Sequence, residues 1–493
     1  MADVRKVLYL SAEVAPFAKT GGLGDVGGSL PKALKALGHD VRVVMPAYKS
    51  IEDGRFPNIS ALPMQINVPT GGGNIPCGVF KGSLPGSDVP VYFIAQWNLF
   101  KRDNIYGYWD DPYRFAFFSR AALELARALK WKPDVVHCHD WHTAPAITWL
   151  ATAGASDPFF AHTPTVFTIH NLAIQGNTNW HIFDYLGILT HSLAEEAYGE
   201  VNLIARGIYH ATMVNTVSPT YALEIMTREG GAGLDGLLRH RAYDLHGILN
   251  GIDYDEWNPA TDPHLPAHYS AETFALDGAE ERLRNRRALQ VRLGLPQVDN
   301  VPLVAMVSRL TWQKGLDIMG HVLHLLMNGF SGPAQFVVLG TGDSQYESMF
   351  AQLAGYHREK MTAVLAYEAD LAPLIYGGSD MFLMPSLFEP CGLGQLIAMR
   401  YGSVPIVRAT GGLADTVQEP VTGFVFHNFN EEEFWHAVQR AIYVYNVDKP
   451  RWQEIQRNGM KADFSWERSA SGYEQLYEWA IARVGAVAHN GSS

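Results

Sequence analysis

Val7-Leu-Tyr-Leu10, a short and continuous apolar run, leads straight into the loop Ser11-Ala-Glu-Val-Ala-Pro-Phe-Ala-Lys-Thr-Gly-Gly-Leu-Gly-Asp-Val-Gly-Gly28. Such a run, bounded by turn residues, is typical of a strand with both faces buried. The chain continues with Pro31-Lys-Ala-Leu-Lys-Ala-Leu-Gly38, whose final glycine is typical of a helix end. A strand, a glycine-rich loop and a helix in this order begin a doubly wound α/β domain.

The alternation of short apolar runs with amphipathic stretches continues along the chain and then starts again. In the first half, further strands are expected at 41–45, 89–95, 134–139, 165–170 and 213–218, with a helix at 116–129. In the second half, strands are expected at 301–308, 335–340, 361–367, 380–385, 404–408 and 423–426, with helices at 315–328, 394–401 and 431–444. An arginine-rich helix near 280–293 lies between the halves.

We therefore predict an α/β protein of two doubly wound domains, with a boundary near Asn250. Ligands of such sheets bind beyond the carboxyl ends of the strands, so two facing domains are expected to share one cleft.

The composition fits this prediction and excludes several classes of function. The chain has 493 residues, enough for two to four domains, and a formal net charge of −12 without runs of like charge. A general affinity for nucleic acid or anionic membranes is not expected of it. Three cysteines at no metal-ligand spacing, no signal-peptide pattern and no apolar stretch of about 18 residues predict a cytoplasmic protein. The sequence does not decide the oligomeric state.

The first glycine-rich loop matches the G-x-G-x-x-G pattern of dinucleotide-binding domains between Gly22 and Gly27. Those domains also need an acidic residue after the second strand to hold the ribose, and this chain has Val44-Met-Pro-Ala-Tyr-Lys49 there. Lys19, just before the glycines, instead favours an anionic sugar nucleotide that approaches the backbone closely. The alternative is that the glycines only allow the helix to pack against the strand.

The first strand of the second half is followed by a comparable loop, Ser308-Arg-Leu-Thr-Trp-Gln-Lys-Gly315. Lys19, Arg309 and Lys314 would together form a positive site in an acidic protein. A diphosphate leaving group requires such a site, because its negative charge grows as its bond breaks. The alternative is that Arg309 and Lys314 are solvated loop charges.

A further loop of the second half, Pro385-Ser-Leu-Phe-Glu-Pro-Cys-Gly-Leu-Gly-Gln395, lies between an expected buried strand and a helix. Its glycines are expected to leave backbone N–H groups available for phosphate oxygens. Because a carboxylate only accepts hydrogen bonds, Glu389 is expected to bind sugar hydroxyl groups, unless it is a surface residue in a proline-rich turn. Cys391 is expected to be packed, since no partnered histidine follows it in the motif.

The run His137-Cys-His-Asp-Trp-His142 has the residue types of a metal site but not the geometry. On a strand His137 and His139 face one way and Cys138 the other, so no zinc site is expected. Asp140 and His142, beyond the strand, are expected to bind sugar or to orient an acceptor hydroxyl. His170, at the end of the next strand, is expected to be functional because it faces the predicted cleft. A structural role for His170 is the alternative.

Two further residues give weaker signals. Tyr367 is expected to stack on a nucleobase or to pack in the interior. Asn250 begins an Asn-Gly turn, whose default role is structural.

Taken together, the motifs resemble those of the bacterial glycogen synthases and plant starch synthases, a family of retaining glycosyltransferases. They run in the family's order across nearly the whole chain: Lys19-Thr-Gly-Gly-Leu-Gly-Asp25, His139-Asp-Trp-His142, Thr168-Ile-His-Asn171, Asn250-Gly-Ile-Asp253, Ser308-Arg-Leu-Thr-Trp-Gln-Lys-Gly315, Phe388-Glu-Pro-Cys-Gly392 and Thr410-Gly-Gly-Leu-Ala-Asp-Thr416.

The resemblance implies a GT-B architecture, in which two Rossmann-like domains face each other across a deep cleft. Residues 1–249 would form the acceptor-side domain, residues 250–465 the donor-side domain, and residues 466–493 a helix that crosses back to the first domain. The implied reaction transfers glucose from ADP-glucose to the non-reducing end of an α-1,4-glucan such as glycogen, with retention of configuration.

The resemblance also implies roles for single residues. Lys19 corresponds to the lysine that binds the sugar nucleotide, and Glu389 to the glutamate that holds the donor glucose. Arg309 and Lys314 correspond to the pair that neutralises the diphosphate. Asp140 and His170 match residues that line the sugar site. Other substrate-binding positions implied by the motifs are Gly22, Asp25, Asn250, Tyr367, Cys391, Gly392, Leu393 and Gly394. Many bacterial relatives have threonine in place of Gly394, so one hydroxyl directed at the phosphate is absent here.

The resemblance and the residues agree on the course of the reaction. Retention by double displacement needs a nucleophilic carboxylate beneath the anomeric carbon. If Glu389 binds sugar hydroxyls instead, front-face attack is expected, with the departing phosphate accepting the proton of the acceptor. Arg309 and Lys314 would supply the positive charge that a metal supplies in other transferases, so no metal or other cofactor is expected.

Three other functions stay open on the residues alone. A retaining glucan hydrolase would use Asp140 and Glu389 as its carboxylate pair, but it leaves the cationic loops unexplained. A non-catalytic glucan-binding protein on the same scaffold would be favoured by the loss of Lys19, Arg309 or Glu389, all of which are present. An NAD-dependent oxidoreductase lacks its ribose-binding acid.

Overall fold

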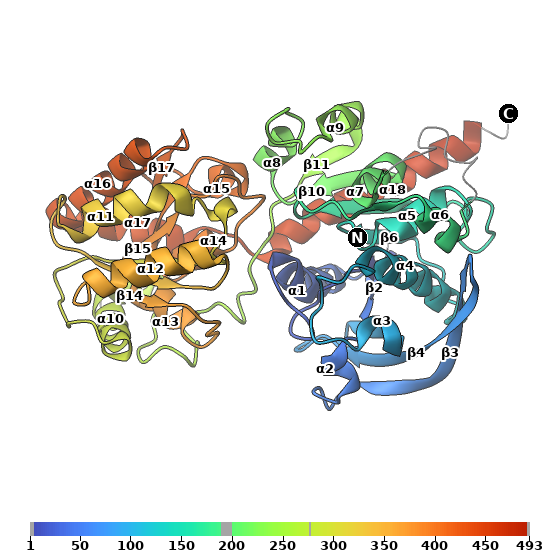
Figure 1. The fold of residues 1–493 in the computed structure, drawn as a ribbon, viewed down its shortest axis with the longest axis horizontal. Coiled ribbons are helices and arrows are strands. Elements are labelled where there is room, and N and C mark those ends of the chain that lie inside the picture. Colours follow the sequence, from blue (N-terminus) through green and yellow to red (C-terminus); the bar gives the residue numbers. More distant parts are fainter. Residues whose placement is uncertain (1–3, 189–199, 276–277, 491–493) are drawn as a thin grey trace. The chain divides into compact units, whose positions relative to one another are not determined.

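The structure, a computed structural model, describes residues 4–188, 200–275 and 278–490. The chain divides into two compact units, which are coloured by sequence in Figure 1. The first unit comprises Met1–Gly251 and Trp466–Ser493, and the second comprises Ile252–Ser465. The boundary expected after residue 249 falls at the same turn, and the terminal segment expected from residue 466 belongs to the first unit.

The main sheet of the first unit is parallel apart from its β3–β4 edge. Its strand order is β11-β10-β7-β6-β1-β2-β5-β4-β3, and β3 and β4 run antiparallel to their neighbours. The strands of this unit are β1 (Lys6–Leu10), β2 (Asp40–Pro46), β3 (Ser60–Thr70), β4 (Gly73–Ser83), β5 (Pro90–Ala95), β6 (Val135–His139), β7 (Thr165–Ile169), β8 (Asn177–Asn179), β9 (Glu200–Asn202), β10 (Met213–Thr216) and β11 (Leu245–Gly247). The strands β8 and β9 form a separate pair.

The strand order reverses direction at β1. From β1 the chain proceeds to β2 and β5 on one side, and β6, β7, β10 and β11 then follow on the other. The loops after β1 and β6 therefore leave neighbouring strands at the same edge of the sheet, which is where doubly wound sheets bind ligands.

The helices of this unit are α1 (Gly22–Ala36), α2 (Lys49–Glu52), α3 (Trp97–Phe100), α4 (Asp111–Ala128), α5 (Ala144–Ala151), α6 (His181–Leu186), α7 (Leu203–His210), α8 (Pro219–Glu224), α9 (Asp235–His240) and α18 (Trp466–Asn490).

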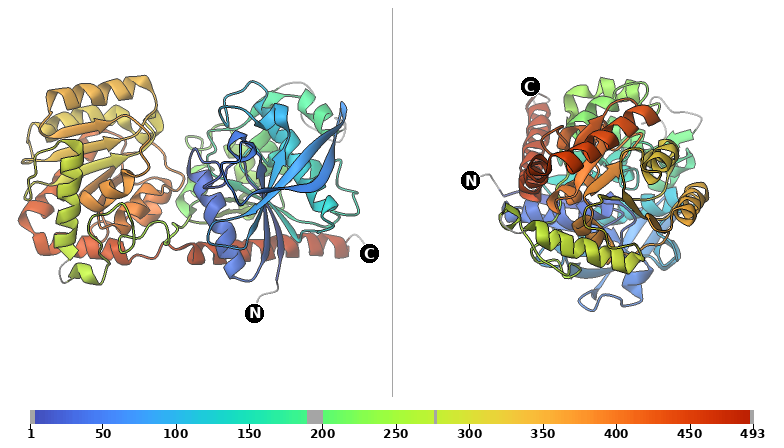
Figure 2. Two further views of the ribbon diagram at one scale, coloured as in Figure 1. Left: turned by 90° about the horizontal axis from the view of Figure 1, so that it is seen from below. Right: turned by 90° about the vertical axis from the view of Figure 1, so that its left-hand side faces the viewer.

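The C-terminal helix α18 is part of the core of the first unit, although almost the whole chain separates it from β1. It packs against α1, β6, β7 and β10, and Figure 2 shows it running along this unit. Tyr473 and Tyr477 of α18 are fully buried in the same apolar cluster as the strands. Since this burial of large aromatic side chains favours docking, the helix is an integral element of the unit.

The second unit is built on a fully parallel sheet with the order β14-β13-β12-β15-β16-β17. Numbered along the unit, this is the order 3-2-1-4-5-6 of a Rossmann fold, and the sheet lies between layers of helices (Figure 1). Its strands are β12 (Leu303–Val307), β13 (Gln335–Leu339), β14 (Met361–Val364), β15 (Met381–Met384), β16 (Val404–Arg408) and β17 (Phe424–Phe426). Its helices are α10 (Gly278–Leu293), α11 (Met319–Met327), α12 (Ser344–Tyr356), α13 (Ala372–Gly378), α14 (Gly394–Arg400), α15 (Gly411–Thr416), α16 (Glu431–Val447) and α17 (Lys449–Lys461). The strand order reverses between β12 and β15, so the loops after these two strands flank the switch point.

The prediction of two doubly wound units is confirmed, and every strand expected from an apolar run is present. The hairpin β3–β4 was not expected, because its residues alternate between buried and exposed positions instead of forming a continuous apolar run. The helix expected at 315–328 is wrong at its start. Gly315 has a φ of 72°, and two short 3₁₀ turns precede α11, which begins at Met319.

Among the described residues, no helix is both long and apolar enough to cross a membrane.

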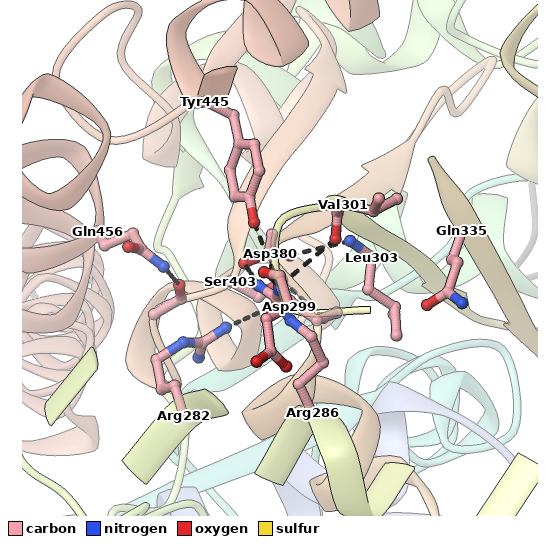
Figure 3. Close-up of polar contacts among 12 residues, drawn as sticks. Arg282, Arg286, Asp299, Val301, Leu303, Gln335, Asp380, Ser403, Tyr445 and Gln456 are labelled. Atoms are coloured by element: carbon pink, nitrogen blue, oxygen red, sulfur yellow. Dashed lines mark hydrogen bonds and ion pairs between the residues drawn. The ribbon is translucent and has the colours of Figure 1, made fainter. Parts of the chain in front are cut away.

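A buried polar network joins α10 to the amino ends of the strands of the second sheet (Figure 3). Arg286 of α10 is ion-paired with Asp380 and donates to the hydroxyl of Tyr445 at 3.2 Å. The second carboxylate oxygen of Asp380 accepts from the backbone N–H of Leu303 at 2.9 Å. The side chains of Arg286 and Asp380 are only 8% and 6% exposed. The network therefore fixes the arginine-rich helix to the sheet edge opposite the switch-point loops.

Replacing Asp380 with alanine should destabilise the second unit strongly. The change leaves the Arg286 guanidinium buried without its anionic partner, which costs about 3–5 kcal/mol of unfolding free energy. Thermal or urea unfolding of the purified protein measures the loss. The neighbouring Arg287→Ala variant is the control, since it removes only the exposed ion pair with Asp299 and should unfold as the wild type does. Equal stability of Asp380→Ala and the wild type would contradict this account of the network.

Candidate active site

In the first unit, the loop after β1 is organised by the carboxylate of Glu13. This side chain is 4% exposed and accepts hydrogen bonds from the backbone N–H groups of Thr20 at 2.5 Å and Gly21 at 3.2 Å. It also accepts from the hydroxyls of Thr20 and Tyr106, both at 2.7 Å. These backbone N–H groups are thus occupied from inside the protein, and what the loop presents outward is the side chain of Lys19.

Sequence reasoning missed the role of Glu13. The available signal was a carboxylate directly after a buried strand, a position at which an ionised group requires hydrogen-bond partners.

The glycines of this loop have two different functions. A Cβ atom at Gly27 would lie 2.5 Å from the carbonyl oxygen of Glu13, so this glycine allows α1 to pack against the loop. A Cβ atom at Gly22 would meet nothing within 4 Å. The alternative that the glycines serve helix packing therefore holds for Gly27, whereas at Gly22 the space beside the backbone is not filled by atoms of the residues that the structure describes.

Lys19 and Asp25, both expected to contact the sugar nucleotide, contact each other. Lys19 Nζ donates to Asp25 Oδ1 at 2.5 Å, and the two side chains are 37% and 21% exposed. Asp25 lies in the first turn of α1, which begins at Gly22. The motif thus presents an accessible ammonium group whose position is set by a carboxylate on the adjoining helix.

At the neighbouring strand end, Asp140 and His170 lie together. Oδ1 of Asp140 accepts from the backbone N–H of His170 at 2.7 Å, so the carboxylate holds the loop after β7. Asp140 has a φ of 57°, a left-handed conformation that is uncommon outside glycine and occurs where the surroundings fix it. Asp140 and His170 are only 8% and 9% exposed. One oxygen of the Asp140 carboxylate therefore positions the backbone of His170, and the expected contact of Asp140 with sugar stays a prediction.

The electrostatics of this pair follow from burial. Burial raises the pKa of Asp140 to about 7, although the backbone N–H groups of His170 and Asn171 act in the opposite direction. Burial also lowers the pKa of His170 to about 3, so its ring is neutral at pH 7.

His137, the first residue of the histidine run before Asp140, is held by structural contacts. The hydroxyl of Tyr477, on α18, lies 2.8 Å from Nδ1 of His137. The other ring nitrogen of His137, Nε2, lies 2.7 Å from the hydroxyl of Thr168. That hydroxyl donates to Asn215 Oδ1 at 2.7 Å. Both ring nitrogens of His137 are thus engaged by protein groups. Among the described residues, no three His, Cys, Asp or Glu side chains come together as a metal-binding group.

In the second unit, Lys314 and Glu389 form a buried ion pair beside the switch point. Lys314 Nζ donates to Glu389 Oε2 at 2.6 Å, and the hydroxyl of Ser386 donates to the same oxygen at 3.1 Å. The two charged side chains are only 15% and 7% exposed. The loops after β12 and β15, which carry them, are joined by the hydrogen bond from the N–H of Leu387 to the carbonyl of Gln313 at 2.9 Å. The residues expected to bind diphosphate and sugar are therefore adjacent.

A third loop supports this arrangement from behind. The N–H of Gly412, at the start of α15, donates to the carbonyl of Glu389 at 3.1 Å. The Thr410–Thr416 motif thus acts on the backbone that carries Glu389.

The other residues expected at the site of the second unit differ from one another in how exposed they are. The Arg309 side chain is exposed and has no ion-pair partner in the part of the chain that the structure describes. Cys391 is buried, whereas Gly392, Leu393 and Gly394 are partly exposed at the start of α14. The strand expected at 361–367 ends at Val364, so Tyr367 lies in a loop, where it is 85% exposed. This exposure excludes the packing alternative, and the contact of Tyr367 with a nucleobase stays a prediction. A Cβ atom at Gly394 would contact the ring of Phe382 at 3.2 Å, which is a tight fit for the threonine expected of relatives.

Asn250 lies at the end of the first unit and is 5% exposed. Its Oδ1 is buried and accepts no hydrogen bond from the described residues.

Two Rossmann-like units with polar and cationic side chains at their switch points agree with the glycosyltransferase of the GT-B class that the motifs predicted, and the comparisons with known proteins show this class. The sequence matches the family models described as "Starch synthase catalytic domain" over residues 6–240 and "Glycosyl transferases group 1" over residues 293–450. The glycogen synthase of Moorella thermoacetica is 44% identical over 489 residues, which cover 97% of each chain. That of Geotalea daltonii is 44% identical over 496 residues, covering 97% of this chain and all of the relative.

Solved structures agree with the sequence comparisons. The catalytic domain of starch synthase IV from Arabidopsis thaliana, bound to ADP and acarbose, superimposes with a TM-score of 0.90 at 36% identity and covers 98% of this chain and 100% of its own. Sucrose-phosphate synthase from Thermosynechococcus elongatus shares the fold, with a TM-score of 0.61 at 17% identity over 97% of this chain and 99% of its own. The chain belongs to the glycogen synthase and starch synthase family, as its motifs predicted.

The raised pKa of Asp140 predicts a pH-dependent stability. Unfolding returns the carboxyl from a pKa of about 7 to about 3.9, so the folded protein binds the proton more tightly between these values. The stabilising contribution is therefore full below pH 4 and is lost as the pH rises through 7. Relative to Asp140→Asn, which cannot titrate, the wild type should lose roughly 2–3 kcal/mol of unfolding free energy between pH 5 and pH 8.

Urea unfolding of both proteins at pH 5, 6, 7 and 8 measures this difference, and all other titrating groups cancel between them. A difference that is constant, or that grows in favour of the wild type with rising pH, would contradict the assignment.

Proposed function

We propose that this protein is a glycogen synthase that transfers glucose from ADP-glucose to the non-reducing end of an α-1,4-glucan, with retention at the anomeric carbon. The observation that carries the proposal is the buried Lys314–Glu389 ion pair beside the switch point of the second sheet. Membership of the family supports the reaction. The ADP in the related plant structure supports the choice of nucleotide.

The second unit supplies the groups for the donor. The Lys314 ammonium is held in place by a carboxylate and is largely shielded from solvent, with 15% of its side chain exposed. Electrostatic attraction to a phosphate is stronger in such surroundings than in water. When the diphosphate binds, Lys314 neutralises it together with the exposed Arg309. Glu389, an acceptor of hydrogen bonds only, binds hydroxyl groups of the glucose.

The bond changes require no carboxylate nucleophile. The bond between the anomeric carbon and the phosphate oxygen breaks, and the 4-hydroxyl oxygen of the glucan end bonds to the same face of the carbon. The proton of that hydroxyl passes to the departing phosphate oxygen. Lys314 and Arg309 stabilise the charge that develops on the phosphate, and we propose that neither a metal ion nor another cofactor is required.

The first unit supplies further groups. Lys19, with its ammonium beside Asp25, adds positive charge for the sugar nucleotide. Asp140 and His170 bind sugar hydroxyls, and the protein acts in the cytoplasm.

The function is tested by incorporation of labelled glucose into glycogen from ADP-glucose and UDP-glucose in parallel assays. Incorporation from ADP-glucose, faster than from UDP-glucose and unchanged by EDTA, is the expected result. Release of free glucose from glycogen without nucleotide would favour a hydrolase, and the absence of incorporation from both donors would refute the proposal. Loss of turnover on chelation, restored by a divalent cation, would refute metal independence.

Replacing Lys314 with alanine should reduce turnover about 10²–10³-fold. This corresponds to about 3–4 kcal/mol of lost transition-state stabilisation, by analogy with the removal of one oxyanion-hole donor. Steady-state kinetics with ADP-glucose measure the effect, and circular dichroism checks that the variant is folded. Lys360→Ala is the control, because the Lys360 ammonium of the same unit only donates to the carbonyl of Met327, at 2.9 Å, and full activity is expected. Near-normal turnover of Lys314→Ala would exclude the role given to this residue.

A further inference from the structure

His139, the last residue of β6, makes a direct contact with the ring of His170. Its Nδ1 lies 2.9 Å from Nε2 of His170, and the ring centroids are 5.2 Å apart. The next residue, Asp140, holds the backbone N–H of His170. Two consecutive residues of one strand end therefore hold the same histidine, one through its ring and the other through its main chain.

The His139 ring is buried among other rings. It is 0% exposed and lies against the rings of Tyr9 and His137, with centroid distances of 4.2 and 4.1 Å. Burial lowers the pKa of His139 well below its ordinary value, and that of His170 to about 3. Both rings are neutral at pH 7, so each carries a single N–H, and only one of the two nitrogens in contact donates.

The surroundings of His139 decide which ring donates. Its Nε2 is buried and has no hydrogen-bond partner within the described residues. If His170 donated, His139 would carry its proton on Nε2, as a buried N–H without an acceptor, which is rare in proteins. If His139 donates from Nδ1, its Nε2 retains only a lone pair. The second arrangement avoids the orphaned donor, and it requires His170 to accept at Nε2 and to carry its own proton on Nδ1.

The neighbouring His137 cannot donate to His170 in place of His139. The hydroxyl of Thr168 donates to Asn215, so it accepts from Nε2–H of His137, whose Nδ1 then accepts from Tyr477. The proton of His137 is therefore fixed by a complete chain of hydrogen bonds, and no ring nitrogen is left to act on His170.

We propose that His139 is a positioning residue that holds His170 in the Nδ1–H tautomer, so that His170 presents a hydrogen-bond donor to an oxygen atom of the bound sugar. Nδ1 of His170 makes no hydrogen bond to the described residues, and 9% of the residue is exposed. A neutral imidazole can offer a substrate oxygen a donor only through its single N–H, and the contact with His139 selects the nitrogen that carries it. The inference rests on the proposed function for its activity measurements.

Two substitutions of His139 separate positioning from packing. Asparagine places an amide nitrogen near the position of Nδ1 and can donate to His170. Of the two ring nitrogens it lacks only Nε2, which has no partner within the described residues. Leucine fills similar volume without a donor. We expect turnover of His139→Asn within about 3-fold of the wild type. Turnover of His139→Leu should be about 10-fold lower, the upper end of the effect of one neutral hydrogen bond, with little change in KM.

The matched control is His39→Leu. His39 is buried to a similar degree, with 2% exposure, and its Nδ1 accepts from the N–H of Arg5 at 3.2 Å. It precedes β2, at the amino edge of the sheet, whereas His139 ends β6 at the carboxyl edge. This variant should lose stability comparable to His139→Leu and keep its turnover. If turnover is the same in His139→Leu and His139→Asn, or if it follows melting temperature across all three variants, the inference is overturned.

The tautomer itself is measured without catalysis. In ¹⁵N-histidine NMR spectra, the signals lost in His170→Gln identify His170, and we expect a protonated Nδ1 and an unprotonated Nε2. A protonated Nε2 in the wild type overturns the inference. If the wild type transfers no glucose, the proposed function fails, and the NMR result still decides the tautomer.

Discussion

The chemistry of this protein depends on a constraint of parallel sheets: at the switch point, neighbouring strands end at the same edge and their loops diverge from buried backbone. Polar side chains that follow such strands lie close together and partly out of water, so each requires a partner. In the first unit, Glu13 is satisfied by the turn around Thr20, and Asp140 by the backbone of His170. In the second, Glu389 is satisfied by Lys314. The same geometry that positions these groups also supplies each of them with a partner.

The buried carboxylates of the two units have different partners. Glu389 has an ammonium at 2.6 Å. In the proposed reaction, the pair exchanges this internal contact for contacts with a phosphate and a sugar. No ion pair is formed by Asp140 within the described part of the chain, and burial raises its pKa to about 7. A carboxylate with a cation suits the binding of an anionic leaving group. A carboxyl group with a raised pKa, held by backbone N–H groups, suits the fixing of a loop beside neutral hydroxyl groups.

Much of the fold could be predicted from the sequence, because strands buried on both faces appear as continuous apolar runs. The hairpin β3–β4 could not be predicted in this way, since one face of each strand is exposed and its residues alternate. Most candidate residues were found because they lie in the loops that follow the predicted strands. Their partners were not, since the pairing of Lys314 with Glu389, or of Glu13 with Thr20, depends on how loops pack. The position of Tyr367 was wrong because β14 ends three residues earlier than its apolar pattern suggests.

The central claim is that Lys314 and Glu389 hold the donor, and the structure of a complex with ADP-glucose or a non-transferable analogue tests it most directly. The account predicts Lys314 Nζ within hydrogen-bonding distance of a diphosphate oxygen and the Glu389 carboxylate bonded to glucose hydroxyl groups. A complex in which the diphosphate is bound away from Lys314, with the Lys314–Glu389 contact unchanged, would contradict it.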